Sequence, residues 1–186
     1  MPFLEILTRT FGGRPRMFAA QQASLAAQTD HDFVHTVLMD GKRRGLEWAT
    51  ENMGAYAPQL VGDYVWVLDD DDLCILPTFV AGLKEIATLN APDVIFVRMD
   101  HGGGRILPSA RWGKPPRCGE IGVSAFVVCR ALWQACAGAW SPGRYTSDFN
   151  FINAVWQTRP VTYWWDVMAS RVQVQSIGQS EQSEDA

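Results

Sequence analysis

The sequence lacks the features that would place it directly in a zinc-binding, membrane or nucleic-acid-binding class. Its four cysteines form no CxxC pair, so a zinc site is not expected. No apolar run approaches the ~20 residues that a membrane-spanning helix needs. The formal net charge is −4 and the only dense basic run is Lys42-Arg43-Arg44. No nucleic-acid-binding face is therefore expected, because proteins that follow phosphate backbones are usually basic.

The N-terminus also lacks the pattern of a secretory signal. The opening MPFLEILTRT carries an acid at Glu5 and has no basic segment followed by a long apolar stretch. We therefore expect a cytoplasmic protein whose cysteines are reduced thiols rather than two disulfides.

What is present is an ordinary globular composition. The chain has 186 residues, of which 47% are hydrophobic and 19% are charged, enough to bury one sizeable core. Its first half alternates strand and helix patterns, which is typical of an α/β fold with helices flanking a sheet. Strands are predicted at 3–8, 33–39 and 64–68, and helices at 16–28 and 45–56. Residues 64–68, YVWVL, resemble a strand in the buried middle of a parallel sheet.

The second half has a less regular pattern. It predicts helices at 77–89, 131–137 and 147–156, a hairpin from 93–99 and 105–107, and strands at 121–129, 161–165 and 171–174. We predict a single compact domain over residues 1–175 with a mixed, mainly parallel sheet. Residues 176–186, SIGQSEQSEDA, are polar and acidic and are expected to form a flexible tail.

Four aspartates directly follow the apolar third strand, in the run VWVLDDDD at residues 65–72. Ligands in open α/β sheets bind beyond the carboxyl ends of the strands, so the ends at residues 8–10, 40–41 and 69–72 should meet. In an extended segment Asp69 and Asp71 point to one side and Asp70 and Asp72 to the other. Carboxylate oxygens suit a divalent cation, so Asp69 and Asp71 are candidate ligands of a Mn²⁺ or Mg²⁺ that bridges phosphates.

Other interpretations of the aspartates remain open. They could form a solvated acidic turn at the start of the next helix, where acids are favoured. An EF-hand loop is excluded, because its required Gly and Glu positions hold Cys74 and Val80. The segment also resembles haloacid-dehalogenase phosphatases, whose first Asp is a nucleophile, although Leu73 replaces the Thr or Val of that family.

Three segments resemble family 2 glycosyltransferases with the Rossmann-like GT-A fold. SLAAQTDHDFVHTVLMDG at 24–41 is similar to the family's S-(I/L)-x-x-Q-T followed by a strand that ends in Asp. RGLEWATEN at 44–52 is similar to R-G-x-x-x-A-x-N, and GDYVWVLDDDD at 62–72 to G-(E/D)-Y-(I/V)-x-x-L-D-x-D-D. The segments occur in the family's order and cover about half of the chain.

The resemblance implies a nucleotide-sugar donor, with a UDP-sugar expected, bound by residues 1–100. The implied donor-binding residues lie at the three strand ends: Thr8, Asp40, Arg44, Asp69 and Asp70. Asp40 would contact the base, and Asp69 with Asp71 would hold the metal that stabilises the leaving diphosphate. Lys42 and Arg43 could also meet the diphosphate, although a solvated loop explains them equally well.

Residues 101–175 would form the acceptor half. Inverting members of the family carry a Glu-Asp pair at the start of a helix there, and YTSDFNFINAVW at 145–156 has Ser147 and Asp148 at that place. Asp148 is the candidate general base, which takes the proton of the acceptor hydroxyl. Alternatively, Ser147 caps the helix and Asp148 only favours its dipole.

The sequence thus predicts a metal-dependent, inverting glycosyltransferase that moves a sugar from a nucleotide-sugar to an acceptor hydroxyl. The acceptor is not identified. Two alternatives stay open: a nucleotide-binding protein of the same fold without transfer activity, and a metal-dependent phosphatase built on Asp69 and Asp71.

Overall fold

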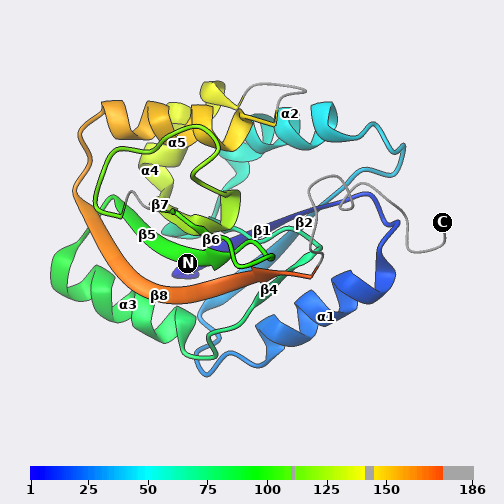
Figure 1. Ribbon diagram of the computed structural model, residues 1–186, viewed down its shortest axis with the longest axis horizontal. Coiled ribbons are helices and arrows are strands. Elements are labelled where there is room, and N and C mark those ends of the chain that lie inside the picture. Colours follow the sequence, from blue (N-terminus) through cyan, green and yellow to red (C-terminus); the bar gives the residue numbers. More distant parts are fainter. Residues whose placement is uncertain (110–111, 141–144, 174–186) are drawn as a thin grey trace.

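A computed structural model describes residues 1–109, 112–140 and 145–173 of the chain (Figure 1). The strands are β1 (Leu4–Thr10), β2 (Phe33–Met39), β3 (Tyr64–Val67), β4 (Asp72–Cys74), β5 (Val94–Asp100), β6 (Ile106–Leu107), β7 (Phe126–Cys129) and β8 (Thr162–Val172). The α-helices are α1 (Pro15–Ala26), α2 (Leu46–Tyr56), α3 (Phe79–Asn90), α4 (Arg130–Cys136) and α5 (Ser147–Gln157). Short 3-10 helices are η1 (Ala57–Gln59), η2 (Val123–Ala125) and η3 (Ala137–Ala139).

The strands form one mixed sheet in the order β2-β1-β3-β7-β5-β8-β4, and β6 pairs with β5. Parallel pairing joins β2, β1 and β3 at one side and β5 with β8 further along. The remaining pairs, β3–β7, β5–β7, β5–β6 and β4–β8, are antiparallel. The predicted α/β class and mixed, mainly parallel sheet are confirmed: β2, β1, β3, β5 and β8 run in one direction, and β7, β4 and β6 run in the opposite one.

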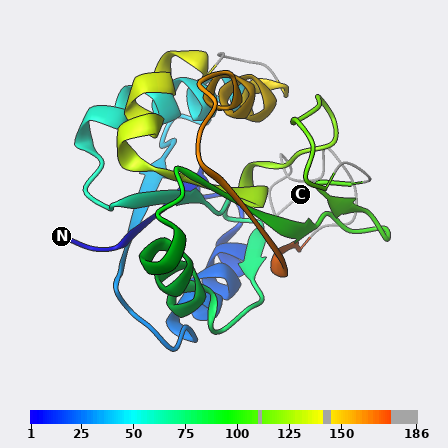
Figure 2. The same cartoon turned by 90° about the vertical axis from the view of Figure 1, so that its left-hand side faces the viewer.

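Helices cover both faces of the sheet. Helices α1 and α3 lie on one face and α2, α4 and α5 on the other, as Figures 1 and 2 show. Alternate side chains of a strand point to opposite faces, so β3 contributes Val65 and Val67 to one core and Trp66 to the other. The first core includes Met53, Trp133 and Phe151 from α2, α4 and α5, and the second includes Leu25 and Leu83 from α1 and α3.

Several predicted elements need correction. The strand expected at 121–129 is only β7, preceded by the 3-10 helix η2. The two strands expected at 161–165 and 171–174 are one long strand, β8, within the described residues. Its middle has no strand-forming run, but it pairs with β5 through register shifts near Arg98, so tertiary pairing outweighs the local propensity.

The structure bears on the expected cysteine state but not on the expected tail. The tail predicted at 176–186 lies outside the described residues, and so does residue 174. All four cysteines are described and free, as expected for reduced thiols. Among the helices of the described ranges, none has the length and apolar character that crossing a bilayer requires.

Candidate functional site

A cavity of about 660 Å³ opens at the carboxyl ends of β1 and β3. Its wall joins the two halves of the chain, because the segments after β1, β2 and β3 face residues near β5, β6 and the start of α5. Charged side chains from both halves line it: Arg9, Arg14, Asp40, Arg43, Asp69, Asp71, Asp72, Arg105 and Asp148. The predicted convergence of three strand ends is therefore present.

The aspartate run is neutralised in part by two arginines from the segment that begins with β1. Arg9 donates to both oxygens of Asp69, with Nε 2.7 Å from Oδ1. Arg14 pairs with Asp70 through one nitrogen and donates from Nη1 to Oδ2 of Asp71 at 2.6 Å. These pairs offset the repulsion that four adjacent carboxylates would otherwise cause.

The two arginines do not neutralise the run completely. Burial raises the pKa of Asp70 to about 7, although Arg14 opposes the shift. Burial also raises the pKa of Asp71, again against the charge of Arg14, and raises that of Asp72 well above its usual value. The buried cluster therefore carries excess negative charge that protons or another cation would relieve.

The carboxylates of the predicted metal pair, Asp69 and Asp71, are engaged by guanidinium groups in this arrangement. Both oxygens of Asp69 accept hydrogen bonds from Arg9, and one oxygen of Asp71 accepts from Arg14. Within the described ranges, no group of three or more His, Cys, Asp or Glu side chains is placed to hold a metal. A metal on this pair would have to displace a guanidinium group.

The alternation expected for the aspartates is also only partly present. Asp69 and Asp71 line the cavity and Asp70 does not, as predicted, but Asp72 lines it as well. The reason is that residues 69–72 form a turn, closed by the backbone N–H of Asp72 on the carbonyl of Asp69 at 2.9 Å. An extended strand would have pointed Asp72 away.

Asp40 follows β2 and organises the loop that leads to α2. Its carboxylate accepts the backbone N–H groups of Gly45 at 3.0 Å and Lys42 at 3.2 Å, and Nε of Arg44 at 3.2 Å. Burial alone would raise the pKa of Asp40, but these hydrogen bonds bring it below its usual value. Asp40 is therefore a fixed anion in the cavity wall.

Three predicted donor-binding residues do not line the cavity. Thr8 is fully buried and binds the carbonyl of Leu68, because β1 continues two residues beyond the predicted end and places Thr10 at the cavity instead. Asp70 is fully buried against Arg14. Arg44 points to Asp40 and lies over the ring of Trp48, with its side chain 51% exposed.

Asp148 comes from the second half of the chain and lies in the first turn of α5, facing the strand ends across the cavity. Its Oδ1 accepts the backbone N–H of Phe149 at 2.7 Å. Burial raises the pKa of Asp148 to about 6, while the Phe149 N–H and the charge of Arg9 oppose the shift. A base near neutrality suits proton transfer. Ser147 is the first helical residue and not the cap, which is Thr146.

Comparison with solved structures identifies similar folds. The chain superposes on TarS 1–349 of S. aureus with a TM-score of 0.65 at 12% identity, covering 91% of this chain and 60% of that one. The same fragment solved in complex with UDP-GlcNAc gives 0.66 at 12% identity, with 94% and 59% covered. A CMP:2-keto-3-deoxy-manno-octonic acid synthetase complexed with CTP gives 0.56 at 14% identity, with 90% of both chains covered.

The likeness shows a shared fold. That fold is the Rossmann-like, GT-A-type α/β arrangement that the sequence predicts. Neither a known family model nor a curated protein sequence matches the chain. The chain spans about 60% of the TarS fragment, so the remainder of that fragment has no counterpart here.

Sequence reasoning missed several residues of the cavity. Arg9 and Arg14 are paired with carboxylates that lie 56 or more residues away, which local patterns do not reveal. The only sequence feature that could have indicated them is their position after the predicted strand 3–8, because the strand 64–68 is followed by four aspartates. Phe11 and His101 also line the cavity, the latter from the segment between β5 and β6.

Proposed function

We propose that the chain transfers a sugar from a nucleotide-sugar to an acceptor hydroxyl. The observation that carries the proposal is one cavity shared by Asp40 and Asp69, from the predicted nucleotide half, and Asp148, from the predicted acceptor half. A transferase needs this arrangement, because donor and acceptor must meet in one site next to a base.

A UDP-sugar is the donor that we propose. TarS, which shares the fold, has been solved with UDP and with UDP-GlcNAc, and both complexes superpose on most of this chain. The motifs similar to family 2 glycosyltransferases lead to the same proposal. Asp40 would contact the base, and Asp69 with Arg9 would border the ribose and diphosphate.

The proposed chemistry is a single displacement. The carboxylate of Asp148 takes the proton of the acceptor hydroxyl while that oxygen forms a bond to C1 of the sugar. The bond from C1 to the phosphate oxygen breaks, and the nucleoside diphosphate leaves with the electron pair. Attack opposite to the leaving group inverts the configuration at C1.

Dependence on Mn²⁺ or Mg²⁺ remains a prediction from the sequence, and no step above depends on it. Of the alternatives, the phosphatase is not favoured, because both oxygens of its candidate nucleophile Asp69 accept hydrogen bonds from Arg9. Nucleotide binding without transfer differs from the proposal only in activity.

Thermal-shift titrations with UDP, GDP, CDP and dTDP, each with and without Mn²⁺, test the donor site first. A ligand that binds only the native state raises the melting temperature by mass action. Sugar donors that carry the stabilising nucleotide are then assayed for transfer to simple sugar and alcohol acceptors and for slow hydrolysis. Stabilisation by one nucleotide supports the proposal, whereas no shift with any of the four contradicts it.

A further inference from the structure

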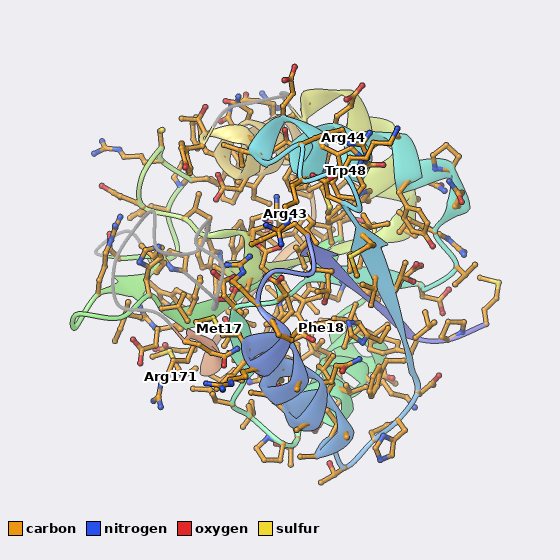
Figure 3. All side chains as sticks on the ribbon, turned by 90° about the vertical axis from the view of Figure 1, so that its right-hand side faces the viewer. Met17, Phe18, Arg43, Arg44, Trp48 and Arg171 are labelled. Carbon is orange, nitrogen blue, oxygen red and sulfur yellow. The ribbon has the colours of Figure 1, made fainter. Side chains whose placement is uncertain are left out.

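The loop between β2 and α2 carries three consecutive basic residues, but only one of them lines the cavity. Arg43 lines it, whereas Lys42 and Arg44 do not. In Figure 3, Arg44 and Trp48 lie together at the start of α2 while Arg43 lies below them, toward α1. Of the three basic residues, Arg43 is therefore the one that lies at the cavity.

The backbone of this loop holds Arg43 in a fixed orientation. Asp40 accepts the N–H groups of Lys42 and Gly45 on its carboxylate, and its carbonyl accepts the N–H of Arg43 at 3.1 Å. Arg43 has a φ of 51°, a left-handed conformation that is uncommon outside glycine. Strained residues of this kind cluster at ligand sites, where the surrounding structure enforces them.

Unlike Arg9, Arg14 and Arg44, Arg43 has no carboxylate partner among the described residues, and Arg105, which also lines the cavity, donates to the carbonyl of Gly119. Arg9 pairs with Asp69, Arg14 with Asp70 and Asp71, and Arg44 with Asp40. Arg43 instead lies 5.8 Å from the centre of the Phe11 ring, and it makes no ion pair within the described residues. An unpaired cation at a cavity otherwise rich in aspartate is available to an anionic ligand.

We propose that Arg43 binds the diphosphate of the nucleotide donor. The inference rests on the proposed function and assigns the residue that recognises the charged part of the donor. A guanidinium group donates two parallel hydrogen bonds to phosphate oxygens, which gives both affinity and orientation. Arg43 would also stabilise the charge that the leaving diphosphate acquires when the bond to the sugar breaks.

The test compares Arg43→Gln with Lys42→Gln, which removes the same charge from the same loop but outside the cavity. UDP binding is measured by isothermal titration at fixed ionic strength, and uridine binding by ligand-observed NMR. We expect Arg43→Gln to weaken UDP about 10- to 100-fold and uridine less than about twofold, because only the phosphate contact is lost. Lys42→Gln should change UDP affinity less than about threefold.

Unchanged UDP affinity in Arg43→Gln would overturn the inference while the proposed function stands. Equal losses of UDP affinity in Arg43→Gln and Lys42→Gln would also overturn it. They would indicate that only the positive charge of the loop matters and not a contact made by Arg43. If the wild-type chain binds none of the four nucleoside diphosphates, the proposed function fails and the inference with it.

A second variant separates binding from folding. Arg43→Gly removes the guanidinium group and also the side chain that makes a φ of 51° unfavourable. We expect it to melt at the wild-type temperature or slightly above, yet to lose UDP affinity as Arg43→Gln does. Arg43→Lys should recover part of the affinity, because it restores the charge without the paired hydrogen bonds. Full UDP affinity in Arg43→Gly would refute the assignment.

Discussion

Replacing Asp148 by Asn tests the proposed base directly. The amide keeps the size of the side chain, and its oxygen can still accept the N–H of Phe149, so α5 should begin as before. It cannot take a proton from an acceptor hydroxyl. Loss of a general base reduces turnover typically by about 10²- to 10⁴-fold, and we expect that range for the transfer rate. Binding of UDP should change less than about threefold.

The same substitution should not weaken the fold. Burial raises the pKa of Asp148 from 3.8 to about 6, so folding disfavours its charged form. At 1.36 kcal/mol per unit, the carboxylate costs at most about 3 kcal/mol at neutral pH. An acid whose folded pKa is raised costs stability above that pKa and costs nothing below its unfolded value. Asp148→Asn should therefore unfold at an equal or higher urea concentration at pH 7.5, with no gain at pH 3.5.

The pH dependence of transfer by the wild-type protein is a third test of the role of Asp148. Transfer should rise with pH through an apparent pKa near 6 and level off above about pH 7, because only the carboxylate accepts the proton. Asp63→Asn is the matched control, since Asp63 is exposed and does not line the cavity. Normal transfer by Asp148→Asn would refute the role. So would a loss of transfer accompanied by an equal loss of UDP affinity.

Three further substitutions test the framework around the cavity. Gly62→Ala should destabilise the fold by about 1–3 kcal/mol in urea titrations, because its Cβ would collide with the backbone of β1, whereas Gly41→Ala, in open space, should change little. Arg14→Gln should cost about 3–5 kcal/mol at pH 8 by leaving buried carboxylates unpaired, and less at pH 5.5, where Asp70 with its pKa of about 7 is protonated in the fold. Arg44→Gln removes a half-exposed ion pair, so thermal shifts and UDP titrations should both stay close to wild type.

The fold could be predicted from the sequence where a pattern is local. The alternation of β1, α1, β2, α2 and β3 follows from hydrophobic periodicity, and each element lies within a few residues of its expected place. Prediction from the sequence failed where pairing between distant strands determines the structure. The strand β8 continues through a segment without strand propensity because β5 lies beside it, and β7 inserts antiparallel between β3 and β5, an order that no local pattern gives.

The candidate site also contains residues that local patterns predict and residues that depend on contacts between distant segments. The sequence predicts Asp40, Asp69, Asp71 and Asp148 as site residues because each follows a strand or begins a helix. All four line the cavity, and their roles stay predictions. Thr8 was misplaced because two more residues of β1 pair with β2 before the strand ends. The partners of the aspartates, Arg9 and Arg14, depend on contacts between distant segments, and no short motif encodes those contacts.

The number of protons taken up or released when UDP binds should show whether a metal takes part in binding. The pKa values of Asp70, Asp71 and Asp72 are already raised, chiefly by burial, so Arg9 and Arg14 leave part of the negative charge unmatched. Without a divalent ion, an incoming diphosphate adds like charge and must raise these pKa values further, so UDP binding should take up protons. With Mn²⁺ on the carboxylates, binding should release them. Titration calorimetry of UDP in buffers of different ionisation enthalpy therefore distinguishes a site that binds the diphosphate through arginines alone from one that binds it through a metal.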